Sequence, residues 1–159
     1  RHMFANANTP EGYVDFTHTL LGDCWNIYYI EGDIGTGKSS VMERIVEEGK
    51  IRGYDMEIYH NSTIPEKIES IIIRDFKTCI TSNKKGLDFP HFKINLNNYF
   101  NPKIKNNRDY EIYNVVMEEA TKNLALAKTN HKILEEAYKT SIDFSGVDKV
   151  KENIIREIF

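Results

Sequence analysis

The sequence predicts a three-layer α/β fold with a mostly parallel sheet and a helical C-terminal part. Three patterns lead to this prediction. A strand-like run is followed by a glycine-rich turn and a helix, a second alternating segment comes downstream, and a long stretch of helical spacing fills the last third of the chain. With 159 residues, 40% of them hydrophobic, the chain is long enough for one domain with its own core.

The first of these patterns begins with the segment 25–31, which is rich in aromatic and β-branched residues and predicts a buried strand. A helix is expected from Lys38 to Arg52, with Gly53 as its stop signal. Its apolar residues recur at helical spacing: Val41, Met42, Ile45 and Val46. Strand, glycine-rich turn and helix therefore follow one another directly.

The turn from Gly32 to Ser39 matches the phosphate-loop pattern G-x-x-x-x-G-K-[ST], or Walker A motif, at every fixed position. Glycines leave the backbone N–H groups bare for phosphate oxygens, and the helix start is positive. Lys38 would contact the β- and γ-phosphates, and the Ser39 hydroxyl would bind Mg²⁺. The residues expected to hold a nucleoside triphosphate are Gly32, Asp33, Ile34, Gly35, Thr36, Gly37, Lys38, Ser39 and Ser40.

We expect residues 1–24 to form an N-terminal arm with a turn at 10–12, and 25–159 to form the nucleotide-binding domain. Strict alternation over 54–60 predicts a second strand that ends at His60. A short helix over 66–70 follows, and then two short strands, 71–73 and 78–81, around a polar turn. This order predicts a sheet joined by right-handed crossovers.

Residues 83–109 are rich in Asn and Lys and read as irregular, either a solvated loop or a lid over the phosphates. The basic residues of this segment are His91, Lys93, Lys103, Lys105 and Arg108.

From about Tyr110 to Ser141 the spacing predicts a helix with one apolar stripe. The stripe consists of Ile112, Val116, Ala120, Leu124, Ala127, His131, Leu134 and Tyr138. His131 is expected to be an interface histidine rather than a ligand. Asp143 or Ser145 can cap a last helix that carries Val147, Val150, Ile154 and Ile158.

Bulk properties exclude several classes of protein. A net charge of −3 and a pI of about 6.0 argue against nucleic acid as the main partner. No apolar run is long enough for a membrane span, and no signal peptide is recognisable, so a cytoplasmic location is expected. Cys24 and Cys79 are too few for a disulfide framework or a metal cluster, and are expected to be reduced.

With these motifs in view, the chain resembles a family of bacterial P-loop ATPase-like proteins that carry two tandem P-loop halves, and it looks like the second half. The matching segments are 1–4, 9–12, 32–39 and 52–60, with scattered helical positions between 127 and 144. The resemblance implies ATP as the nucleotide, Mg²⁺ as its cation, and the tandem half or a second copy as partner. Both ends also look cut, so a piece of a longer protein is expected.

One departure from that family concerns hydrolysis. Family members end the Walker B strand with an acidic residue and a glycine, whereas Ser82 and Asn83 stand at this position here. A serine brings no charge to Mg²⁺, so nucleotide binding is expected without fast hydrolysis. Asp75 is the nearest upstream acid and is expected to be a surface turn residue.

Three functions therefore stay open. The first is an ATP-binding domain with weak ATPase (hydrolase) activity, in which Lys38 is catalytic and His60 either contacts substrate or metal or is a polar strand-end residue. The second is a small-molecule or nucleotide kinase, with His60 near the acceptor and the basic residues of 103–108 as a lid. The third is a half-domain that binds nucleotide without catalysis.

Overall fold

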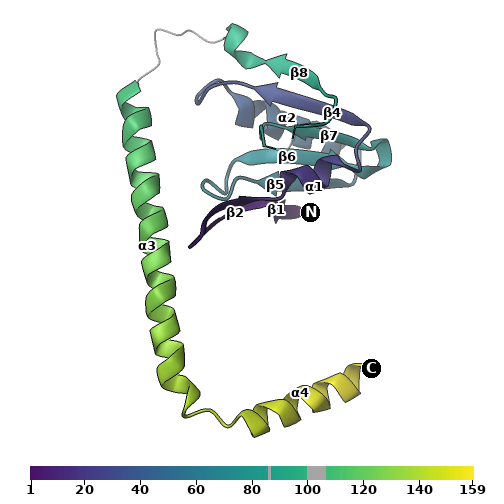
Figure 1. The fold of residues 1–159 in the computed structure, drawn as a ribbon. Coiled ribbons are helices and arrows are strands. Elements are labelled where there is room, and N and C mark those ends of the chain that lie inside the picture. Colours follow the sequence, from purple (N-terminus) through teal and green to yellow (C-terminus); the bar gives the residue numbers. More distant parts are fainter. Residues whose placement is uncertain (86, 100–106) are drawn as a thin grey trace.

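The computed structural model describes residues 1–85, 87–99 and 107–159, and its main body is a six-stranded sheet (Figure 1). The strand order is β1-β5-β6-β7-β4-β8. These strands are β1 (His2–Phe4), β4 (Asn26–Glu31), β5 (Met56–His60), β6 (Ile68–Ile73), β7 (Thr78–Thr81) and β8 (Phe92–Asn95). A separate antiparallel hairpin consists of β2 (Asn6–Thr9) and β3 (Gly12–Asp15). The helices are α1 (Thr17–Leu21), α2 (Lys38–Ile51), α3 (Asn107–Lys139) and α4 (Phe144–Ile158), with 3₁₀ turns η1 (Arg74–Phe76) and η2 (Leu96–Tyr99).

The sheet is mostly parallel, as predicted, and β6 is the strand that runs against the others. The pairs β1–β5, β4–β7 and β4–β8 are parallel, whereas β6 is antiparallel to both β5 and β7. Strands β6 and β7 form a hairpin around η1, where two short strands around a polar turn were expected. Strand β6 is also antiparallel to β5, so the crossover expected between these two strands is absent. The predicted helix over 66–70 is wrong, because Ile68 and Ile71 are β-branched and bury their side chains in the core from strand β6.

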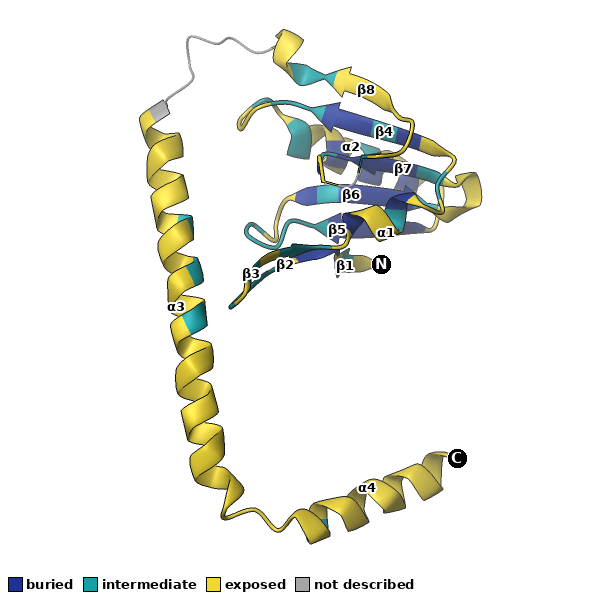
Figure 2. Ribbon diagram, in the orientation of Figure 1, coloured by how far each residue is buried: buried dark blue, intermediate teal, exposed yellow. Residues whose placement is uncertain are grey.

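Two cores lie on opposite faces of the sheet, which gives three layers. On one face α2 packs its apolar side onto the strands, in a cluster of Ile30, Met42, Val46, Met56, Ile58, Ile68, Ile71 and Ile80. On the other face Leu21 of α1 joins a smaller cluster with Ala5, Ile27, Tyr59, Ile72 and Cys79. The central strands are the most deeply buried part of the molecule (Figure 2).

The expected N-terminal arm and the segment expected to be irregular each add a strand to this sheet. Within the expected N-terminal arm, β1 pairs with β5, so that His2 lies opposite Ile58. Within 83–109, β8 pairs with β4, so that Phe92 lies opposite Tyr28. The expectation of irregular structure is therefore wrong for 92–99. Lys103 and Lys105 lie outside the described residues.

A polar network fastens the β2–β3 hairpin to the sheet. Asn83 Nδ2 donates to Asp15 Oδ2 at 2.7 Å, to Thr17 Oγ1 at 3.0 Å and to Glu69 Oε2 at 3.3 Å. The side-chain amide of Asn6 also donates to Glu69. Burial opposes the ionisation of Asp15, but hydrogen bonds from Thr17 and Asn83 outweigh it and lower the pKa of this carboxyl. Burial raises the pKa of Glu69.

The C-terminal helices extend away from the body (Figure 1). The helix predicted from about 110 is confirmed as α3, and the cap of α4 is Asp143, whose side chain accepts from the backbone N of Ser145 and Gly146 at 3.1 and 3.2 Å. Among the described residues, none of the helices has the length and apolar character that a membrane span requires.

The polar network makes a prediction about stability and pH. Replacing Asp15 with Asn removes a charged acceptor, and we expect the free energy of unfolding at pH 7 to fall by about 1–2 kcal/mol. Since the folded pKa lies below the ordinary value of 3.8, this stabilisation is present above pH 3.8 and is lost as the pH falls through the folded pKa. The difference between wild type and Asp15→Asn should therefore shrink below about pH 4.

Urea unfolding at a series of pH values, followed by circular dichroism, measures this difference. The exposed Asp55 provides the matched control as Asp55→Asn. Equal losses for both variants, or a difference that does not change between pH 7 and pH 3, would contradict the role given to the network.

Candidate functional site

A tight turn of residues 32–37 leads from the end of β4 straight into α2. Gly35 and Gly37 both have φ of +88°, a left-handed conformation that other residues adopt only with strain. Thr36 closes the turn, since its backbone N and its Oγ1 donate to the carbonyl oxygen of Asp33 at 3.3 and 2.8 Å. The glycines predicted from the motif therefore lie where the backbone needs them.

The short turn η2 packs beside this loop. Asn97 Oδ1 accepts from the backbone N of Asp33 at 2.9 Å. Gly32 is packed so closely that an added Cβ would lie 2.3 Å from Thr36 Oγ1 and 3.3 Å from Leu96 Cβ. Sequence reasoning missed Leu96 and Asn97, although the alternation of Phe92, Lys93, Ile94 and Asn95 was a usable signal for the strand that carries them.

Lys38 is half-buried and turns its ammonium group into the loop. Its Nζ donates to the carbonyl oxygens of Gly32 and, at 2.8 Å, of Asp33. Burial lowers the pKa of Lys38, the Asp33 carboxylate opposes this shift, and the charge of Lys67 adds to it. The Lys38 ammonium therefore donates to two neutral carbonyl oxygens. A negatively charged acceptor in the same place would form stronger, charge-assisted hydrogen bonds with it.

The start of α2 adds a second attraction for anions. Gly37 is the N-cap without any side-chain hydrogen bond, and the first N–H groups of a helix have no partner within the helix. Ser39 is half-buried in the first turn, and Ser40 beside it is exposed. Ile34 at the tip of the loop is also exposed. Backbone N–H groups, the helix dipole and the Lys38 ammonium therefore converge on one small region.

His60 does not belong to this region. It ends β5, and β6 and β7 separate β5 from β4, which amounts to roughly 14 Å across the sheet. His60 Nε2 instead lies 2.7 Å from Nδ1 of His2, and the two rings stack. Burial, with the charge of His60, lowers the pKa of His2. The structure therefore does not bring His60 and Lys38 together.

Ser82 lies next to the turn of residues 32–37, at the end of the neighbouring strand, as expected. It follows β7, which pairs in parallel with β4 so that Thr81 lies opposite Tyr29. Ser82 Oγ donates to the carbonyl oxygen of Glu69 at 3.2 Å. Asp75 lies in η1, between β6 and β7 at the far end of both strands, and is a turn residue as expected.

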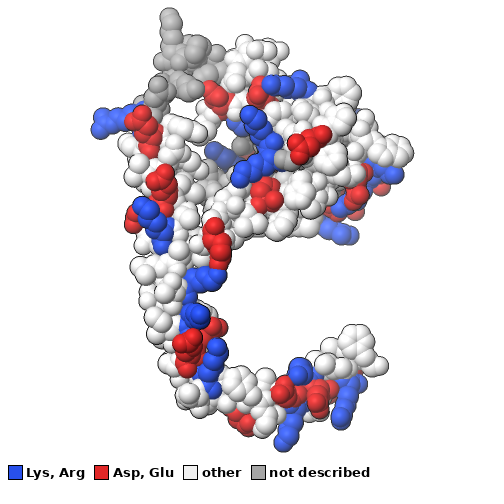
Figure 3. Space-filling view, viewed as in Figure 1, with Lys and Arg blue, Asp and Glu red and all other residues white. Residues whose placement is uncertain are grey.

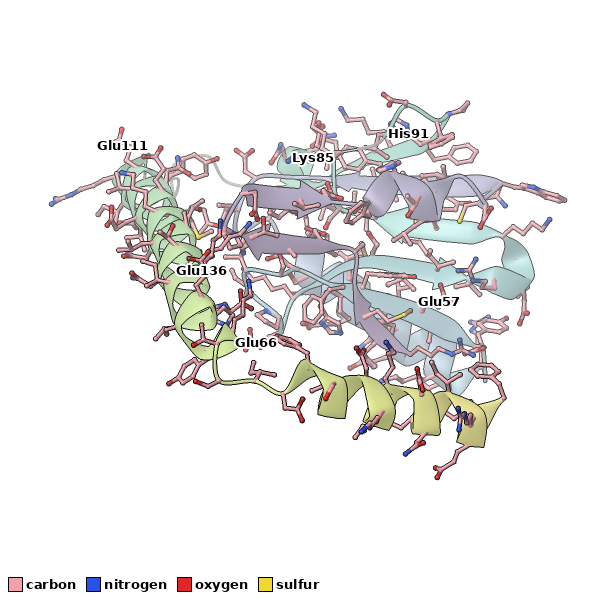
Figure 4. All side chains as sticks on the ribbon, turned by 60° about the horizontal axis from the view of Figure 1, so that its bottom comes forward. Glu57, Glu66, Lys85, His91, Glu111 and Glu136 are labelled. Atoms are coloured by element: carbon pink, nitrogen blue, oxygen red, sulfur yellow. The ribbon has the colours of Figure 1, made fainter. Side chains whose placement is uncertain are left out.

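The remaining basic residues of the predicted lid lie along the sheet. His91 Nδ1 is 2.9 Å from the carbonyl oxygen of Phe89, and Lys93 Nζ is 2.7 Å from Glu31 Oε2. His91 and Glu57 lie toward opposite edges of the sheet (Figure 4). Arg108 belongs to α3.

No group of three or more His, Cys, Asp or Glu side chains suited to a metal ion occurs among the described residues.

Comparisons of the chain with protein-family models, with curated proteins and with solved structures found no significant match.

The packing of Gly32 leads to a prediction about binding. Gly32→Ala places a methyl group against Thr36 and Leu96, so we expect the loop to shift and the affinity for a magnesium–nucleotide complex to fall about tenfold or more. Gly22→Ala is the matched control, because an added Cβ there meets nothing within 4 Å. Isothermal titration calorimetry with Mg²⁺-ATP on both variants measures the effect. Equal affinities for the two variants would contradict the prediction.

Proposed function

We propose that this chain binds a nucleoside triphosphate together with Mg²⁺ through residues 32–40, with ATP as the preferred nucleotide. The observation that carries the proposal is the position of Lys38, whose ammonium points into a glycine-rich turn and donates to the backbone carbonyl oxygens of Gly32 and Asp33. The preference for ATP comes from the family resemblance.

Binding would exchange one set of acceptors for another. Phosphate oxygens would replace the carbonyl oxygens of Gly32 and Asp33 as partners of Lys38 Nζ, and charge-assisted hydrogen bonds of this kind are roughly twice as strong as neutral ones. The unpaired N–H groups at the start of α2 would bind the same phosphates. Ser39 would provide a hydroxyl ligand for Mg²⁺, with the remaining ligands supplied by the nucleotide and water.

Binding without rapid turnover is the form of this function that the site supports best. Fast hydrolysis in P-loop proteins uses a carboxylate beside the loop, which holds Mg²⁺ and orients water. Here Ser82 follows the neighbouring strand, and its hydroxyl is engaged by the Glu69 carbonyl. The nearby carboxylates of Asp15 and Glu69 share Asn83 in the network that anchors the hairpin. A kinase activity gains little support, since His60 lies away from the loop.

Removing the ammonium group tests the proposal directly. Lys38→Ala should weaken Mg²⁺-ATP binding by about 1.5–3 kcal/mol, or roughly ten- to hundredfold, because charge-assisted hydrogen bonds are lost. Lys77→Ala is the matched control: Lys77 lies over the Trp25 ring near η1, at the end of β7 remote from the loop. Calorimetry should show normal affinity for the control. If Lys38→Ala bound as tightly as wild type, the proposed site would be wrong.

A second prediction concerns turnover. We expect phosphate release from Mg²⁺-ATP near background for the wild-type chain, while binding stays measurable. If the missing carboxylate limits hydrolysis, Ser82→Asp should raise the rate, and adding Lys38→Ala should abolish the gain. Robust hydrolysis by the wild-type chain that Lys38→Ala removes would show that another acid takes the role assigned to a Walker B residue.

A further inference from the structure

Most of α3 and all of α4 expose apolar side chains to solvent (Figure 2). α3 meets the body through Met117, Thr121 and Ala125, which are half-buried, and through the ion pair between Lys128 and Glu11 on the hairpin turn. Beyond residue 128 every residue of α3 is exposed, including Leu134 at 55% and Tyr138 at 63%. A contiguous apolar surface of this kind on a soluble protein marks an interaction site.

The apolar residues on α3 follow the spacing of a coiled coil. Steps of four and three residues alternate through Tyr113, Met117, Ala120, Leu124, Ala127, His131, Leu134 and Tyr138. We call the free part of this row, from Leu124 to Tyr138, the α3 seam. The residues of the α3 seam are not the ones that contact the hairpin, so the α3 seam stays available while α3 is attached to the body. In a coiled coil, each side chain of such a row packs between four residues of a facing helix, so the α3 seam requires a second helix.

We propose that the occupant of the α3 seam is the same segment of a second copy of this chain, in antiparallel orientation. A two-fold axis lets one surface patch pair with itself and closes the assembly at two copies. In the antiparallel arrangement Ala127 packs near the partner's Tyr138, and His131 packs near the partner's Leu134. The small side chain of Ala127 then faces the large one of Tyr138. The two bodies point away from each other at opposite ends of the paired helices.

The charges beside the seam favour this orientation. Lys128 and Glu135 flank it on the same side, one heptad apart. Antiparallel pairing brings Lys128, which in its own chain contacts Glu11 of the hairpin, close to the partner's Glu135 as well, and by symmetry this contact forms twice. Parallel pairing would instead put His131 against the partner's His131 and Lys128 beside the partner's Asn123. On the face drawn in Figure 3, acidic and basic side chains are interspersed along α3 and α4, as an interface with paired charges requires.

α4 enlarges the same interface. Two heptads of one helix pair bury less than the total of about 1,600 Å² that is usual for a stable complex. Four residues separate the end of α3 from the start of α4, which carries its own exposed apolar row of Val147, Val150, Ile154 and Ile158. Packed across the paired α3 helices, the α4 helices of both copies would cover these rows and complete a four-helix interface.

Two neighbouring residues of α3 provide a matched test. Leu134 lies in the seam and is 55% exposed, whereas Ile133 lies beside it and is 62% exposed. Light scattering after size-exclusion chromatography should give the whole chain twice its mass of 18.5 kDa. Leu134→Lys should raise the dimer dissociation constant at least about tenfold, since the change enters the interface twice, and Ile133→Lys should leave it near the wild-type value. Circular dichroism checks that both variants keep their helices.

Charge exchange tests the orientation. Glu135→Lys alone should weaken the dimer, and it leaves the contact between Lys128 and Glu11 of its own chain in place. Glu135→Lys combined with Lys128→Glu should restore the dimer, because the ion pair is rebuilt with its signs reversed. A monomeric wild-type chain, or equal dissociation constants for Leu134→Lys and Ile133→Lys, would overturn the proposal. A double variant no tighter than Glu135→Lys would overturn the antiparallel arrangement.

Discussion

The turn that joins β4 to α2 determines how α2 packs on the sheet and which groups lie at the start of that helix. Lys38 holds the carbonyl oxygens of Gly32 and Asp33, and Gly37 turns the chain into the helix. The same turn sets the direction of α2, whose residues Met42 and Val46 complete the larger core. One local conformation therefore fixes both the packing of the helix on the sheet and the convergence of positive groups at its start.

Much of this could be predicted from the sequence, because local patterns specify it. The glycine-rich motif of residues 32–39 predicts a strand before it and a helix after it, and the structure has both. Spacing alone defined α3, and the carboxylate of Asp143 caps α4. Ser82 also lies where it was expected, next to the strand that precedes the loop. In each case residues close in sequence carry the information.

What could not be predicted depends on long-range pairing. β1 has three residues, too short for a periodic signal, and β8 has four, whose alternation does not say which strand they join; each is placed by its partner strand. The order of strands across the sheet decides that His60 meets His2 rather than Lys38, and no local pattern encodes that order. The exposed seam of α3 is similar: its spacing is visible in the sequence, but only the structure shows that the body leaves it uncovered.

If Lys38 exchanges its carbonyl acceptors for phosphate oxygens, as we propose, nucleotide binding must change the loop at the start of α2. Amide chemical shifts from nuclear magnetic resonance, recorded during a titration with Mg²⁺-ATP, measure this change residue by residue. We expect the largest shifts at the backbone amides of residues 35–39, saturating together, while amides around His60 and on α4 change little. Unchanged amides at 35–39 under saturating Mg²⁺-ATP, or larger changes elsewhere, would contradict it.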